Sequence, residues 1–123
     1  MNGPNILIDT NIALYLLSGN STIAEILNGS TIYISFITQL ELLGYKEINS
    51  NEHQKIKQFI HDCIIVDINE EIKKHTIAIK QKHKLKLPDS IVAATSLFLD
   101  IPLLTADKEF AKISSLNLAL YKE

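Results

Sequence analysis

The sequence contains no arginine and a single cysteine, Cys63. One cysteine excludes an intrachain disulfide and a zinc site built from cysteines. The longest uncharged stretches, 10–24 and 26–40, contain Asn, Ser, Gly and Thr and fall short of the roughly 20 apolar residues that a transmembrane helix needs. The four glycines are scattered, which excludes the glycine-rich phosphate loops of Walker and Rossmann motifs.

The rest of the composition is ordinary for a globular protein. The 123 residues are 46% hydrophobic and 21% charged, and 12 lysines nearly balance 14 acidic residues, for a net charge of −2. No repeat, low-complexity tract or Pro/Gly-rich linker divides the chain, so we expect a single domain over residues 1–123. The near-neutral charge argues against a general nucleic-acid coat but allows a local basic patch.

The N-terminus gives no targeting signal. Met1-Asn2-Gly3-Pro4 lacks the positive charge of a signal peptide, and Asp9 follows soon after. The triplet Asn20-Ser21-Thr22 therefore does not predict glycosylation. We expect the reducing cytoplasm as the compartment, with no membrane partner.

Short runs of Ile, Leu and Val alternate with longer helical patterns. The runs predict strands at 6–8, 31–34, 64–66 and 102–104 and a weaker fifth at 116–120. The helical patterns lie near 10–18, 22–28, 38–48, 52–61, 70–83, 89–99 and 107–113. Continuous apolar strands separated by helices are typical of a parallel sheet covered on both faces. We therefore predict an α/β fold of three layers, α/β/α, around a central parallel sheet of four to five strands.

Four acidic residues are expected at one end of this sheet. Asp9 follows the first strand, and Asp107 lies just past the fourth. Asp89 opens an uncharged helix, 90–99, which is apolar on nearly all sides and so belongs against the sheet. On a helical wheel of about 100° per residue, Glu41 lies about 20° beyond the edge of the apolar arc and can point along the core boundary. In such sheets, ligands bind outside the carboxyl ends of the strands.

Each acid also has a purely structural interpretation. Asp is a preferred N-cap, so Asp9, Asp89 and Asp107 could each start a helix. Thr38-Gln39-Leu40-Glu41 fits a capping box. Taken together, four converging carboxylates would repel one another unless a cation neutralises them, and oxygen ligands of this kind favour hard ions such as Mg²⁺. A carboxylate-bound metal that activates water is how many nucleases cleave phosphodiesters.

Four segments match a known family in order and spacing. The chain resembles a PIN-domain ribonuclease, and its small size and D-x-I-x-A-A-T helix look most like the VapC toxins of toxin–antitoxin pairs. The segments that carry the resemblance are Ile6-Leu7-Ile8-Asp9-Thr10-Asn11, Ser35 with Thr38-x-x-Glu41-Leu42, Pro88-Asp89-Ser90-Ile91-Val92-Ala93-Ala94-Thr95, and Leu104-Thr105-Ala106-Asp107-x-x-Phe110. They span almost the whole chain.

The resemblance implies an endoribonuclease that uses Mg²⁺ or Mn²⁺. The family's acidic quartet falls on Asp9, Glu41, Asp89 and Asp107. Asp9 and Asp89 are then the leading metal ligands, Asp107 is the third, and Glu41 completes the shell through water or orients the attacking water. The polar helpers fall on Asn11 and Thr105, which would hold these carboxylates by hydrogen bonds.

The resemblance also implies partners. These are an RNA substrate, with tRNA and rRNA as candidates, a cognate VapB-like antitoxin whose C-terminal segment occupies the active-site groove, and a second copy of the chain in a homodimer. The family often has arginine around the groove, and here lysine must take its place. A PIN nuclease of RNA processing without a toxin role is the alternative within the family, and an inactive PIN fold is disfavoured because all four acids are present.

Six lysines lie between residues 73 and 86 with no acid among them. Lys84 and Lys86, next to the expected site, are candidates for gripping RNA phosphates. Lys73 and Lys74 fit a solvated helix that begins with Glu70-Glu71. The four histidines show no metal-binding spacing, and Tyr15, Tyr33, Phe36 and Phe59 are interpreted as packing residues.

A response-regulator receiver domain is the alternative from another class. Asp9, Asp67 and Thr105 follow three of the predicted strands, as in a phosphoacceptor site. A receiver has two adjacent acids after its first strand and a lysine directly after the last strand at the site. This chain has Asp9-Thr10 and, at its very end, Lys122. A receiver would not account for Asp89 or Glu41 either.

Overall fold

A parallel five-stranded sheet forms the centre of the molecule. The computed structural model describes residues 3–46 and 49–122, so Met1-Asn2 and the predicted helical end at 47–48 lie outside the described residues. The strand order is β3-β2-β1-β4-β5, and every neighbouring pair is parallel. The strands are β1 (Asn5–Ile8), β2 (Thr31–Ser35), β3 (Ile64–Val66), β4 (Leu103–Thr105) and β5 (Leu118–Leu120). The predicted parallel sheet is confirmed.

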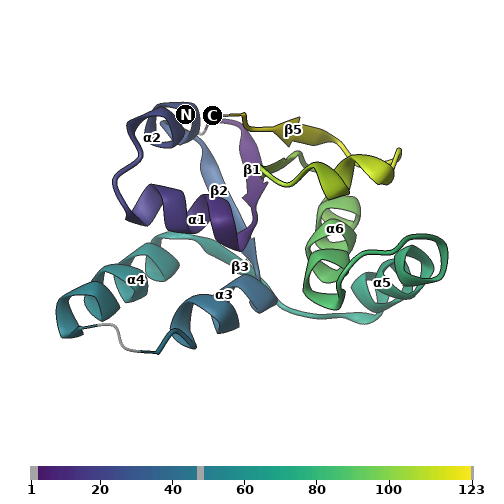
Figure 1. Ribbon diagram of the computed structural model, residues 1–123, viewed down its shortest axis with the longest axis horizontal. Coiled ribbons are helices and arrows are strands. Elements are labelled where there is room, and N and C mark those ends of the chain that lie inside the picture. Colours follow the sequence, from purple (N-terminus) through teal and green to yellow (C-terminus); the bar gives the residue numbers. More distant parts are fainter. Residues whose placement is uncertain (1–2, 47–48, 123) are drawn as a thin grey trace.

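Helices cover both faces of the sheet, as predicted. They are α1 (Thr10–Leu17), α2 (Ser21–Leu27), α3 (Phe36–Leu43), α4 (Ser50–Asp62), α5 (Glu70–Lys82), α6 (Leu87–Leu99) and a short 3₁₀ helix, η1 (Lys108–Lys112). Figure 1 shows α1, α2 and α4 on one side of the sheet and α5 and α6 on the other. Within the described ranges, no helix is long and apolar enough to span a membrane.

Two hydrophobic cores lie on the two faces because successive strand residues point in opposite directions. Leu7 and Leu103 belong to the core under α5 and α6, whereas Ile8 and Leu104 belong to the core under α1, α2 and α4. All four side chains are buried. Burial on both faces explains why these strands are continuous apolar runs without polar alternation.

Helix α6 is as deeply buried as its composition predicts. All residues from Ser90 to Ser96 are buried. The hydroxyls among them are satisfied by backbone carbonyls: Thr95 donates to Ile91 at 2.7 Å and Ser96 donates to Ile101 at 2.8 Å. Buried hydroxyls with partners avoid the cost of an unpaired polar group. The helix is therefore a rigid support for the residues of its first turn.

Two local predictions, the capping box and the helix at 107–113, are wrong, and the predicted strand at 64–66 lies at the edge of the sheet. Helix α3 begins at Phe36 with Ser35 as its N-cap, so Thr38 lies inside the helix and does not form a capping box with Glu41. Strand β3 is an edge strand with half-exposed side chains, because only β2 pairs with it. The predicted helix at 107–113 is the 3₁₀ turn η1.

The contrast between two phenylalanines tests the packing. Phe110 is fully buried against the α5–α6 core, whereas Phe98 on α6 is 40% exposed. We expect Phe110→Ala to lower the free energy of unfolding by about 3–5 kcal/mol, because it leaves a cavity. Phe98→Ala is the matched control and should cost about 1 kcal/mol or less. Urea titration measures both, and equal losses would contradict the assigned core.

Candidate active site

Asp9 ends β1 and caps α1. Its Oδ1 accepts a hydrogen bond from the Ile12 amide at 3.0 Å, and its Oδ2 accepts one from the Thr105 hydroxyl at 2.5 Å. The carboxylate is buried, and this burial raises the pKa of Asp9 above its usual value. The two hydrogen bonds work against that shift, while the nearby charge of Asp107 adds to it. Asp9 is thus both a helix cap and a member of a charged group.

Asp107 lies on the same segment as the residue that holds Asp9. Its Oδ1 accepts from the Glu109 amide at 2.9 Å and caps η1. The backbone amide of Asp107 donates to the Thr105 hydroxyl at 3.0 Å. Thr105 therefore accepts from Asp107 and donates to Asp9, and one buried hydroxyl fixes the spacing of two acids.

Asp89 lies in the first turn of α6 but does not cap it. The N-cap is Lys86, and the helix begins at Leu87, so Asp89 is its third residue and the capping interpretation is wrong. Within the described part of the chain, the Asp89 carboxylate accepts no hydrogen bond. Burial raises its pKa, as do the charges of Asp107, Asp9 and Glu41, while Lys86 lowers it. Asp89 is therefore not a helix cap, and the charged residues around it determine its environment.

Glu41 is held by a residue that the sequence interpretation missed. The Thr10 hydroxyl lies 2.6 Å from Glu41 Oε1 and 3.1 Å from the Thr38 hydroxyl. A hydroxyl carries one proton, so Thr10 donates to the charged Glu41 and the Thr38 hydroxyl supplies the proton of the second contact. Thr10 follows Asp9 directly, which is the signal that could have identified it. The contact joins α1 to α3 and brings Glu41 toward the end of β1.

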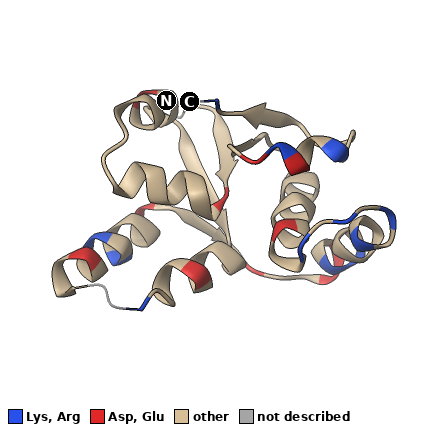
Figure 2. Ribbon diagram, in the orientation of Figure 1, with Lys and Arg blue, Asp and Glu red and all other residues tan. Residues whose placement is uncertain are grey.

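The other three predicted acids lie near enough to Asp89 for their charges to act on it. Asp9, Glu41 and Asp107 each raise the pKa of Asp89, and such repulsion acts only between nearby charges. Figure 2 shows acidic segments at the end of β1, on α3 and on α6. Desolvation and repulsion both disfavour the charged forms of Asp9 and Asp89, and added positive charge would offset this effect.

The chemistry of this group fits a hard divalent cation. In residues 3–46 and 49–122, no three His, Cys, Asp or Glu side chains stand close enough together to hold a metal ion as they are placed. The donors are nevertheless all carboxylate oxygens, which Mg²⁺ and Mn²⁺ prefer. Burial raises the pKa of Asp89, the charges of the other three acids raise it further, and a bound cation would counteract both effects.

The other predicted helpers lie at the surface. Asn11 is exposed, and its side chain makes no hydrogen bond to the four acids in the described structure. Lys84 and Lys86 are exposed on the turn before α6 and form no ion pair with any described residue. Only Lys86 is close enough to act on Asp89. The role of all three in binding remains a prediction.

The neighbouring lysines have structural partners. Lys73 pairs with Glu70 at 3.4 Å and Lys74 pairs with Glu71 at 3.8 Å, as expected for a solvated helix. Lys80 donates to the Leu85 carbonyl at 2.8 Å and holds the turn that precedes α6. The lysines of residues 73–86 therefore lie in three places: on the surface of α5, at the turn before α6 and beside the candidate site.

Asp67 does not join the four acids. It is exposed after the edge strand β3, and its carboxylate accepts from the Ile68 amide at 2.8 Å. Strand β2 separates β3 from β1, which carries Asp9. The arrangement of a receiver phosphoacceptor site is therefore not present at this edge.

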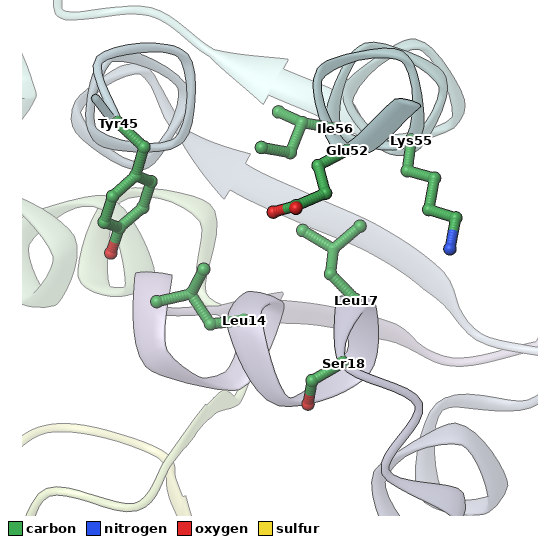
Figure 3. A pocket seen from close by; sticks show the side chains of 7 residues that line it. All are labelled: Leu14, Leu17, Ser18, Tyr45, Glu52, Lys55 and Ile56. Atoms are coloured by element: carbon green, nitrogen blue, oxygen red, sulfur yellow. The ribbon is translucent and has the colours of Figure 1, made fainter. Parts of the chain in front are cut away.

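A pocket of about 510 Å³ lies elsewhere, between α1 and α4 (Figure 3). Its lining is mostly apolar and includes none of the four acids; it consists of Leu14, Leu17, Ser18, Tyr45, Glu52, Lys55 and Ile56. The four acids thus lie outside this pocket.

Comparison with known proteins gives a consistent family. The sequence model of the PIN domain family matches residues 6–116. Among curated proteins, no match was found.

Solved structures match over nearly the full chain. A toxin–antitoxin complex from Klebsiella pneumoniae contains a chain that is 30% identical, with a TM-score of 0.80, and the match covers 93% of this chain and 95% of that chain. VapBC-1 from nontypeable Haemophilus influenzae matches at 25% identity and a TM-score of 0.77, over 94% and 97% of the two chains. VapBC2 from Rickettsia felis, bound to a promoter DNA fragment, shares the fold at 22% identity and a TM-score of 0.78, over 96% and 99%.

The repulsion around Asp89 predicts the stability of Asp89→Asn. In EDTA at pH 7, the variant should melt at the temperature of the parent or up to about 4 °C higher, because one uncompensated charge is removed. Because the pKa of Asp89 is raised, the folded state holds that proton more tightly than the unfolded chain does. The parent is therefore stabilised as the pH falls from 7, and the variant loses the part of this gain due to Asp89. A lower melting temperature of the variant at pH 7 would contradict the proposed strain.

Proposed function

The chain belongs to the PIN domain family, and from that premise we propose that it is a metal-dependent endoribonuclease and the toxin of a VapBC-type toxin–antitoxin pair. PIN domains are nucleases, so the chain is a hydrolase that acts on nucleic acid. The observation that carries the proposal is that Asp9, Glu41 and Asp107 all lie near enough to Asp89 for their charges to act on it, beyond the carboxyl ends of β1 and β4. RNA is the proposed substrate, and the cytoplasm is the proposed compartment.

Asp9, Asp89 and Asp107 are the residues that would hold Mg²⁺ or Mn²⁺. The ion, when bound, supplies the positive charge that activates water and stabilises the leaving oxygen of the phosphodiester. Thr105 keeps Asp9 and Asp107 at a fixed spacing, and its hydrogen bond favours the charged form of Asp9 that a cation needs. Asp89 supplies a carboxylate with no other hydrogen-bond partner among the described residues.

Glu41 is proposed to position the attacking water. Thr10 binds one oxygen of its carboxylate, Oε1, and thereby limits how the side chain rotates. The other oxygen, Oε2, is left to accept a hydrogen bond from water or to take its proton. Glu41 is exposed, as a residue that meets solvent and substrate must be. Lys84 and Lys86 are proposed to contact RNA phosphates beside Asp89. Asn11 is proposed to hold the carboxylates of the metal site by hydrogen bonds.

The proposed antitoxin follows from the similarity to solved complexes. Two of the chains that match at 25% identity or more come from toxin–antitoxin complexes and are covered over almost their full length. We propose a VapB-like partner whose C-terminal segment covers the acidic edge. Growth arrest on expression, relieved by a short gene immediately upstream that encodes a DNA-binding fold, tests this role. Nuclease activity without growth arrest would favour a PIN enzyme of RNA processing.

The activity prediction uses two Asp-to-Asn variants at opposite ends of α6. With Mg²⁺ or Mn²⁺ the protein should cleave structured RNA, and EDTA should abolish the cleavage. Asp89→Asn should lower kcat by about a hundredfold or more, because the ion that stabilises the developing negative charge would lose one of its carboxylate ligands. Asp100→Asn is the control, since Asp100 ends α6 in the left-handed region that Asn also tolerates. Full cleavage in EDTA, or an active Asp89→Asn enzyme, would refute the metal mechanism.

A homodimer is proposed on a surface that the sequence interpretation did not identify. Helices α1 and α2 expose only Ile26 among their large apolar side chains. Exposed apolar side chains instead lie on α3, β3 and the start of α6: Leu40, Leu43, Ile64, Ile65 and Leu87. An apolar surface of this kind is typical of an interface between protein chains.

The dimer prediction is tested by charge at this surface. We expect the parent to sediment as a dimer at tens of micromolar, and Leu40→Glu, which alters a 57% exposed residue, to shift it to monomer. Ile77→Glu is the matched control, because Ile77 is equally exposed but lies on α5. A monomeric parent, or equal effects of the two variants, would count against this surface.

A further inference from the structure

A second pocket lies past the ends of β4 and β5. Its volume is about 390 Å³, and its lining combines two aromatic with two basic residues: Tyr15, Ala106, Lys108, Leu120, Tyr121 and Lys122. Tyr121 and Lys122 follow β5, while Ala106 and Lys108 follow β4. The pocket is therefore at the carboxyl edge of the sheet, where ligands bind in folds of this class.

One segment of chain separates this pocket from the acidic site. The Thr105 hydroxyl donates to Asp9, and the Thr105 carbonyl accepts from the Tyr121 amide at 2.7 Å. Ala106 packs with the core under α1 and α2, on the opposite side from Thr105. The acids and the pocket thus lie on two sides of the segment 105–108. A polymer strand that crosses the edge of the sheet would contact both sides of this segment.

The pocket has the chemistry of a nucleotide site. The rings of Tyr15 and Tyr121 have centroids 6.2 Å apart at 59°, and no acidic residue lines the pocket. Within residues 3–46 and 49–122, Lys108 and Lys122 form no ion pair. Aromatic rings stack on bases, and unpaired lysines bind phosphates. The pocket between α1 and α4, by contrast, carries Glu52 beside Lys55 and has no excess positive charge.

We propose that the pocket of Tyr15, Tyr121, Lys108 and Lys122 is a subsite for one nucleotide of a single-stranded RNA, next to the phosphodiester that is cleaved. A tyrosine ring contacts the base, and the two lysines contact the flanking phosphates. This inference rests on the proposed nuclease function, because it assigns part of the grip on the substrate. The pocket also supplies positive charge for binding RNA. This charge comes from lysines, because the sequence has no arginine.

The test measures RNA binding without cleavage. Fluorescence anisotropy with a 5′-fluorescein-labelled hexauridylate, in EDTA, gives the Kd of the full chain. Lys108→Gln with Lys122→Gln should weaken binding about tenfold and reduce the slope of log Kd against log salt by about 1.4, the value for two phosphate contacts on a single strand. Lys55→Gln with Lys57→Gln removes the same charge from α4 and should leave Kd within about twofold of the parent.

A second variant tests stacking. Tyr121→Leu keeps an apolar side chain in the half-buried position and should weaken binding about tenfold without changing the salt slope. Thermal melting of each variant, compared with the parent, verifies that the fold is retained. If Tyr121→Leu fails to fold, the exposed lysine pair still decides the result.

The outcomes separate the subsite from the nuclease function. If the lysine pair binds RNA like its control, the subsite is refuted, whatever Asp89→Asn shows about cleavage. If RNA binding falls as expected but the parent cleaves no RNA with Mg²⁺ or Mn²⁺, the nuclease function fails while the pocket stands. Unchanged RNA affinity with loss of antitoxin binding would assign the pocket to a protein partner and overturn the proposal.

Discussion

The hydrogen bond from Thr105 to Asp9 is the interaction on which the acidic edge depends. It joins the ends of two neighbouring strands, because the pairing of Ile8 with Leu104 places the next residues of both strands side by side. Burial alone would favour a neutral Asp9, and this bond stabilises the charged form. The same hydroxyl accepts from the Asp107 amide, so the sheet register sets the positions of two acids.

The remaining acids reach this edge through packing rather than through strand pairing. The buried helix α6 positions Asp89. The Thr10 hydroxyl holds Glu41 by a hydrogen bond between α1 and α3. Lys86 is the one cation that acts on Asp89 among the described residues, and repulsion from three carboxylates exceeds its effect. The fold therefore maintains a negatively charged site, whose charge the proposed metal ion would compensate.

The sequence predicted the strands well because they depend on local patterns. Apolar runs define the strands to within one or two residues, and a parallel sheet brings their ends to one edge. The start of α3 was less predictable, because β2 runs into it without a loop and both Ser35 and Thr38 are good caps. The start of α6 was also misplaced. Pro88 fits just before a helix that begins at Asp89, but the helix begins at Leu87 and its N-cap is Lys86. The contact of Thr10 with Glu41 joins residues 31 positions apart, and local patterns carry no information about it.

Successive side chains past the end of β4 alternate between two sides of the chain. This alternation explains how one edge of the sheet presents both an acidic group and a basic pocket. Thr105 faces the acids, Ala106 faces the tyrosine pocket, Asp107 returns to the acids, and Lys108 lines the pocket. If the lysines lay among the carboxylates, they would pair with them and occupy the place of a metal ion. Separation by one segment of backbone leaves the acids free for a cation and the lysines free for phosphates. The proposed nuclease needs both within reach of one RNA strand, and the backbone that follows β4, which is still extended at Asp107, provides this without any additional element.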